Sequence, residues 1–184
     1  MHVKTRTLLF TALFAALTAV GAFLKIPLGH SSITLQFLFT AMAGILLGRR
    51  WGALSQLVYV LVGLVGVPVF TMGGGFGYVL QPTFGFLLGL IPCAWLIGWM
   101  SRRRAGAVWL AASCAAGLGA LYLVGLPYMA LILNGYMGKG MDLSALLWAG
   151  MLPFLPGDAL KIAAAAAVCP ALQKRLCNFD EFRR

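Results

Sequence analysis

Acidic side chains are scarce in this chain: 184 residues include only four Asp or Glu, against fourteen Lys or Arg. Charged residues make up 10% of the sequence, compared with roughly 25% in a typical soluble domain. Hydrophobic residues make up 61%. A small soluble domain cannot cover that much apolar surface, because its exposed shell is largely polar. The composition therefore predicts a protein that is solvated by a lipid bilayer.

The groups that most enzymes need are also few. There are two histidines and four cysteines, with no HExxH motif, no nucleophile elbow and no CxxC spacing. The GGGFG run at 73–77 lacks the Lys-Ser/Thr of a phosphate-binding loop. We therefore expect no enzymatic activity, no metal and no cofactor. The net charge of +10 would suggest nucleic acid for a soluble protein, but here we expect no nucleic-acid partner, because the charges are placed as in a membrane protein.

Long, continuous apolar runs favour helices over barrel strands, which would show alternating segments of about 10 residues. A helix needs about 20 residues to cross the hydrocarbon core. The predicted fold class is all-α: a polytopic membrane protein with six transmembrane helices and both termini cytoplasmic. The whole chain, 1–184, forms one membrane domain, with helices expected at 7–24, 35–48, 52–70, 78–100, 108–133 and 147–172.

The orientation follows from the linkers. Eleven of the fourteen Lys and Arg residues lie at the N-terminus, in the second and fourth linkers and in the C-terminal tail. The first, third and fifth linkers contain only Lys25 and Lys139. Lys and Arg accumulate on the cytoplasmic side of a membrane. This alternation predicts six crossings of the cell membrane, with the Gly-rich third linker outside.

Two charged residues remain inside the predicted membrane segments, Asp158 and Lys161. They are three positions apart and share one face of a helix. A charge at the bilayer centre costs about 2.5–3.5 kcal/mol on insertion scales and usually marks a ligand or a pathway. Pro153 and Pro156 precede the pair and loosen the backbone on the outer side. We predict a binding site open to the outside; the alternative is an ion pair that only locks the last helix to its neighbours.

Two polar or glycine-rich stretches near the outer side are further candidates for ligand contacts. Glycines at 73–77 let the backbone approach a ligand closely, although a plain flexible loop fits equally well. Polar residues after the first helix are candidates for a lid, and an interfacial loop is the alternative. The predicted binding residues in these stretches are Gly74, Gly75, Phe76, Tyr78, Thr34 and Gln36.

The first predicted helix carries small residues four positions apart, as Ala12 with Ala16 and Ala15 with Ala19. Such patterns let helices approach closely. We predict a partner-docking face here, with ordinary intramolecular packing as the alternative.

Several stretches together resemble the BioY family, the biotin-specific S components of energy-coupling-factor (ECF) transporters. They are Ile26-Pro27-Leu28, Thr34-Leu35-Gln36, GLVGVPVF at 63–70, GGFGYVLQPTFGFLLG at 74–89 and PFLPGDALK at 153–161. The sequence departs from the family pattern at Gln81, where a small residue is expected, and at His30-Ser31-Ser32, which replaces a Pro-containing lid.

The resemblance implies a six-helix S-component fold that captures biotin from outside. It also implies docking, through the alanine face of the first helix, on an ECF coupling subunit that works with two cytoplasmic ATPases. The chemistry of biotin matches the charged pair: Asp158 can accept hydrogen bonds from the ureido N–H groups. Lys161 can pair with the carboxylate or donate to the ureido oxygen.

Three other functions compete with this interpretation. A stand-alone or ion-coupled vitamin transporter would use Asp158 as its proton carrier. An intramembrane enzyme acting on lipid lacks a nucleophile–base pair in this sequence, and a purely structural subunit would bind no small molecule. Among ligands, cationic thiamin would not suit the adjacent lysine, and lipoate has no ureido group for Asp158.

Overall fold

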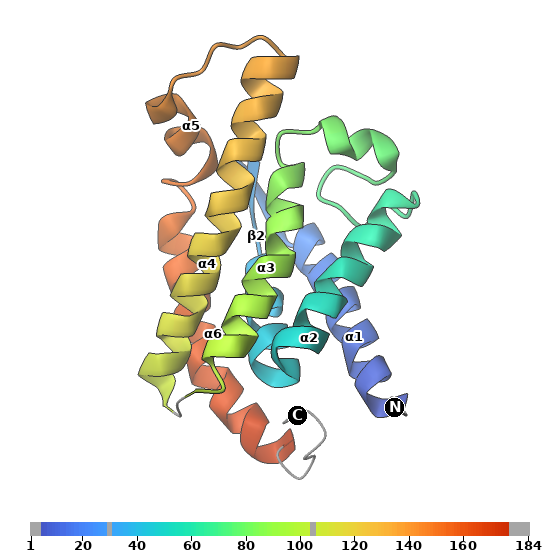
Figure 1. The fold of residues 1–184 in the computed structure, drawn as a ribbon, viewed down its shortest axis with the longest axis vertical. Helices are drawn as coiled ribbons and strands as arrows, with labels where there is room; N and C mark the ends of the chain where they lie inside the picture. Colours follow the sequence, from blue (N-terminus) through green and yellow to red (C-terminus); the bar gives the residue numbers. More distant parts are fainter. Residues whose placement is uncertain (1–4, 29–30, 104–105, 177–184) are drawn as a thin grey trace.

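The computed structural model describes residues 5–28, 31–103 and 106–176. Its long helices run side by side along the long axis of the molecule (Figure 1). They are α1 (Thr5–Phe23), α2 (Gln36–Leu64), α3 (Phe84–Met100), α4 (Ala107–Ala130) and α6 (Leu155–Leu176), with a short α5 (Leu143–Gly150) before the last. A 3-10 turn, η1 (Phe76–Leu80), precedes α3, and a π-helical stretch, η2 (Leu131–Tyr136), extends α4.

Helix α2 is a hairpin of two arms, 36–47 and 49–64, because Gly48 has non-helical dihedrals (φ 82°, ψ −178°). The arms lie so close that a Cβ on Gly52 would come within 2.9 Å of the Gly44 Cα. Two hydrogen bonds also join them, from Gln36 Nε2 to the Tyr59 hydroxyl at 2.8 Å and from Thr40 Oγ1 to Gln56 Oε1 at 3.0 Å. The turn falls beside Arg49 and Arg50, where the sequence predicts the second linker.

Three predicted helix boundaries differ clearly from the structure, and a proline or a glycine lies near each of them. Helix α3 begins at Phe84 rather than 78, because Gln81 precedes Pro82 and is extended (ψ 135°). The second arm of α2 ends at 64 rather than 70, ahead of Gly66 (φ 115°) and Pro68. The predicted helix 147–172 is two helices, α5 and α6, since Pro153 has no N–H with which to continue the first one.

The bundle is all-α as predicted, with one addition in the first linker. Strands β1 (Lys25–Leu28) and β2 (Ser31–Thr34) form an antiparallel hairpin in which Lys25 pairs with Thr34. The Lys25 ammonium donates a hydrogen bond to the carbonyl of Thr71 in the third linker. This bond joins two linkers that the sequence assigns to the outer side.

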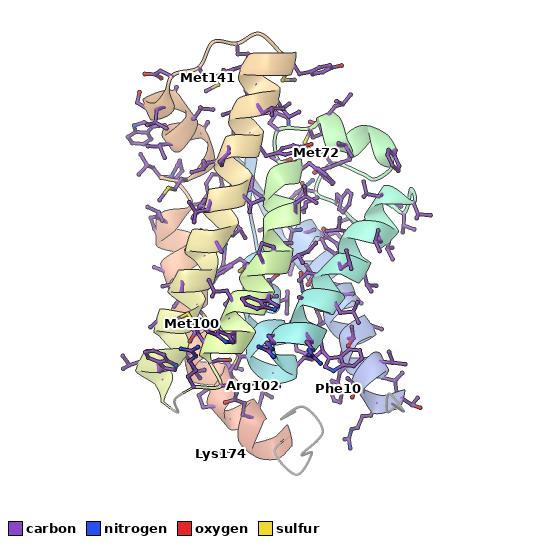
Figure 2. All side chains as sticks on the ribbon, in the orientation of Figure 1. Phe10, Met72, Met100, Arg102, Met141 and Lys174 are labelled. Carbon is purple, nitrogen blue, oxygen red and sulfur yellow. The ribbon has the colours of Figure 1, made fainter. Side chains whose placement is uncertain are left out.

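The two ends of the bundle differ in charge. Helix α1 begins and α6 ends at the same end, where Arg102 and Lys174 also lie, whereas Met72 and Met141 lie at the opposite end (Figure 2). At that opposite end Asp142 caps α5, accepting a hydrogen bond from the Ala145 backbone N–H at 2.9 Å. This bond, with a second from the Ser144 hydroxyl, lowers the pKa of the Asp142 carboxyl. The end of the bundle that carries Arg102 and Lys174 is thus the end that the sequence predicts to be cytoplasmic.

Among the described residues, four helical stretches are long and apolar enough to span a membrane, and α3 is a shorter apolar helix. One of the four is the whole of α2. Because α2 folds back at Gly48, each of its two arms crosses the bundle separately, and its full length does not form one span. At 1.5 Å per residue the arms measure only about 18 and 24 Å, which is less than the hydrocarbon thickness of about 30 Å.

Candidate binding site

A cavity of about 100 Å³ lies among α2, α3, α4 and α6. Aromatic and leucine side chains form most of its wall, among them Phe37, Phe86 and Phe154. The polar side chains that line it come from five different parts of the chain: Thr34, Gln36, Thr71, Tyr78, Thr83, Tyr122, Asp158 and Lys161. An apolar cavity with a few convergent polar groups is the usual form of a small-molecule site.

Asp158 and Lys161 lie in the first two turns of α6, where the local sequence fixes their position. Pro156 is tolerated in the first turn of a helix, because its missing N–H would have no partner there. Asp158 and Lys161 then follow on one face, and the Lys161 Nζ lies 2.8 Å from Asp158 Oδ1. Both residues are buried, at 5% and 7% exposure.

Tyr122 of α4 completes this cluster. Its hydroxyl donates a 2.6 Å hydrogen bond to Asp158 Oδ2, so each carboxylate oxygen has a donor. A buried charge is tolerated when it is paired and hydrogen-bonded, and both conditions hold here. The pair therefore does link α6 to a neighbouring helix. The Asp158–Lys161 pair also lines the cavity. Helix packing by itself therefore does not explain where the pair lies.

The part of the cavity wall formed by β2, the first arm of α2 and the third linker contains three predicted site residues: Thr34, Gln36 and Tyr78. The Thr34 hydroxyl donates to Gln36 Oε1 at 3.0 Å, and Gln36 Nε2 in turn donates to the Tyr59 hydroxyl. Tyr78 and Thr71 share a hydrogen bond of 2.9 Å between their hydroxyls. These bonds hold the polar side chains of this wall in fixed orientations.

Three predicted site residues do not line the cavity, namely Gly74, Gly75 and Phe76. The glycines shape the third linker: Gly75 N–H donates to the Gly63 carbonyl at 2.7 Å, and a Cβ on Gly74 would meet the Val67 carbonyl oxygen at 2.3 Å. The Phe76 side chain is 81% exposed. In this structure the two glycines fold the loop, and contact of Gly74, Gly75 or Phe76 with a ligand remains a prediction.

Three residues that line the cavity are not among the binding residues predicted from the sequence, namely Thr71, Thr83 and Tyr122. Tyr122 is 36 positions from Asp158 in the sequence, and no local pattern connects the two. Thr83 lies in the stretch that follows the glycines and precedes α3. Its position beside Pro82 is the sequence feature that could have pointed to it as a cavity residue.

The predicted docking alanines on α1 divide into two faces. Ala12 and Ala16 are exposed on the surface of the bundle. Ala15 is buried at 8% exposure, and Ala19 is partly buried against the same core. Ala15 and Ala19 therefore pack toward the inside of the bundle. The exposed stripe is Ala12 and Ala16 alone.

No group of three metal-ligating side chains occurs within residues 5–28, 31–103 and 106–176. Cys93, Cys114 and Cys169 are buried free thiols, while Cys177 lies outside the described residues.

These features define a polytopic helical membrane protein with a largely apolar internal cavity that is lined on one side by a charged pair. The chain belongs to the BioY family, whose model matches residues 1–178. A probable biotin transporter BioY of Lysinibacillus sphaericus is 43% identical over 93% of this chain and 88% of its own length. The biotin transporter BioY of Thermotoga maritima is 36% identical over 92% of this chain and 96% of its own.

The fold is likewise that of a solved structure, the S-component for biotin from an ECF-type ABC transporter. The two superpose with a TM-score of 0.81 over 94% of this chain and 95% of the other, at 24% sequence identity.

Proposed function

We propose that this protein is a substrate-binding S component that captures biotin from the extracellular side and delivers it through an ECF-type, ATP-driven uptake transporter. Membership of the BioY family and relatives that are named as biotin transporters support the proposal. The fold, shared with a biotin S-component, agrees with it.

The observation that carries the proposal is the Asp158–Lys161 pair on the wall of an otherwise largely apolar cavity. The ureido ring of biotin presents two N–H donors and one carbonyl acceptor. Asp158 supplies acceptor oxygens for the donors, and Lys161 supplies a donor for the carbonyl or the carboxylate. Phe86 and Phe154 offer apolar cover for the bicycle and the valerate chain. Thr34, Gln36 and Tyr78 complete the proposed site.

The proposed partners are an ECF coupling subunit and two cytoplasmic ATPases. The exposed stripe of Ala12 and Ala16 suits close contact with another helix in the bilayer. We place the coupling subunit on this stripe.

A stand-alone, ion-coupled transporter is the competing function, with Asp158 as the proton carrier. In the structure Asp158 pairs with Lys161 and accepts a bond from Tyr122. Both contacts occupy the carboxylate oxygens, so a transport cycle that moves a proton through Asp158 would have to disrupt them. ATP-driven uptake needs no such change. A protonophore that abolished uptake while ATP was maintained would favour the ion-coupled function.

The test is binding of labelled biotin to the detergent-purified chain, compared with Lys161→Ala and Lys139→Ala. Lys139 is an exposed lysine outside the cavity, so it is the matched control. We expect the parent and Lys139→Ala to bind tightly and Lys161→Ala to lose binding. Absence of binding by the folded parent would contradict capture of biotin by this chain alone.

A further inference from the structure

Thr83 is the one cavity-lining polar side chain that has no hydrogen-bond partner within the described part of the chain. Its Oγ1 atom is buried and unpaired. The others are already paired: Thr34 with Gln36, Thr71 with Tyr78, and Tyr122 with Asp158, which also binds Lys161. A ligand can bond to Thr83 without breaking any contact of the empty protein.

The local backbone does not use this hydroxyl either. Thr83 occupies the N-cap position of α3, where a threonine hydroxyl usually accepts a hydrogen bond from a backbone N–H of the first turn. Here the side chain makes no capping bond, and the Phe86 N–H bonds to the Thr83 carbonyl oxygen instead. The hydroxyl is therefore free to serve the cavity.

No group in the described part of the chain satisfies the Thr83 hydroxyl, and a buried hydroxyl without a hydrogen-bond partner is costly. Such a group is retained at functional sites when a ligand satisfies it. We infer that the Thr83 hydroxyl hydrogen-bonds directly to the bound substrate, and that it is a specificity-determining contact at the N-cap of α3, in the same cavity as the charged pair of α6. This inference rests on the proposed capture of biotin.

The inference predicts opposite effects of one substitution on stability and on affinity. Thr83→Val keeps the shape of the side chain and removes only the hydroxyl. We expect the empty variant to be at least as thermally stable as the parent, because a buried unpaired group is gone. We expect its affinity for biotin to fall about tenfold, the usual effect of one lost hydrogen bond.

Two further variants separate a ligand contact from a structural effect. Thr83→Ser retains the hydroxyl and should restore most of the affinity. Thr11→Val removes a buried hydroxyl that bonds to the Thr7 carbonyl at 2.8 Å, away from the cavity. We expect it to leave biotin affinity unchanged and to gain no stability.

The experiment measures the dissociation constant for biotin and the thermal midpoint, with and without biotin, for the parent and all three variants. Weaker binding by Thr83→Val, with an undiminished midpoint in the empty state and rescue by Thr83→Ser, supports the inference. Equal affinity of Thr83→Val and the parent overturns it, and would mean that water satisfies the hydroxyl. Failure of the parent itself to bind biotin would instead contradict the proposed function.

Discussion

The Tyr122 hydroxyl donates a 2.6 Å hydrogen bond to Asp158 Oδ2 and so connects α4 to α6 at the cavity. The other carboxylate oxygen bonds to Lys161. One aromatic side chain thus completes the hydrogen bonding of a buried acid. Positioning of the carboxylate depends on two different helices.

Tyr122→Phe should therefore destabilise the protein and weaken biotin binding together. The buried carboxylate would lose one of its two donors, which costs about 1–3 kcal/mol, and we expect the thermal midpoint in detergent to fall by several degrees. Tyr136→Phe is the control, because Tyr136 is 64% exposed at the end of η2. Equal midpoints for Tyr122→Phe and the parent would show that this bond contributes nothing to the packing of α4 against α6.

The charged pair itself can be tested for two separate roles. Lys161→Met alone leaves the Asp158 charge unpaired, so we expect a loss of stability of about 3–5 kcal/mol together with loss of biotin binding. The double variant Asp158→Asn with Lys161→Met has no buried charge left, and its thermal midpoint should recover. Its biotin binding should not recover, because the donors and acceptors of the ligand remain unmatched.

If the double variant bound biotin like the parent, the pair would serve only to hold α6 in place. Circular dichroism and thermal melts on the same preparations show whether any lost binding comes from unfolding.

The features of the site and of the fold that could be predicted are those that depend on residues within one segment of the sequence. Asp158 and Lys161 lie three positions apart on one helix, so their ion pair follows from helical geometry alone. The hairpin of α2 could also be predicted, because Arg49 and Arg50 interrupt an apolar run beside Gly48. In both cases neighbouring residues contain the whole signal.

Contacts between distant segments could not be predicted in the same way. Nothing near Tyr122 in the sequence points to Asp158, and their bond depends on how α4 packs against α6. Phe76 and Tyr78 are two positions apart in one 3-10 turn, yet Phe76 is exposed and Tyr78 is buried. On α1, Ala15 and Ala16 are adjacent, and apolar residues surround the helix, so composition alone does not distinguish its inner face from its outer face.

The turn within α2 predicts a strong effect of a small substitution. At Gly48 (φ 82°, ψ −178°) an alanine would be strained, and its Cβ would lie 2.1 Å from an Arg102 guanidinium nitrogen. We expect Gly48→Ala to cost about 1–3 kcal/mol, measured as a lower thermal midpoint. Gly119→Ala is the control, since it lies within α4 and its new Cβ would meet nothing within 4 Å. Alanine should stabilise that helix by about 0.5–1 kcal/mol.

A midpoint for Gly48→Ala at or above that of the parent would mean that the turn can form with helical dihedrals. The hairpin would then be set by the contacts between its two arms.

The two aromatic residues of η1 should differ in their effect on binding. Phe76 lies outside the cavity, so Phe76→Ala should change the biotin dissociation constant by less than about twofold. Tyr78 lines the cavity and bonds to Thr71, so Tyr78→Phe should weaken binding severalfold while the fold is kept. The reverse order in equilibrium binding would place the glycine-rich loop over the ligand, as the sequence alone suggests.

The exposed stripe on α1 predicts a separation of capture from transport. Ala16 faces outward, so Ala16→Trp should fold normally and bind biotin like the parent, while its bulk keeps a partner helix from approaching. Uptake by cells that contain the coupling subunit and both ATPases should be abolished. Val168→Trp is the matched control, because Val168 is exposed at 47% on α6, and we expect normal uptake from it. Normal uptake by Ala16→Trp at equal expression would remove α1 as the docking helix and return the ion-coupled transporter to consideration.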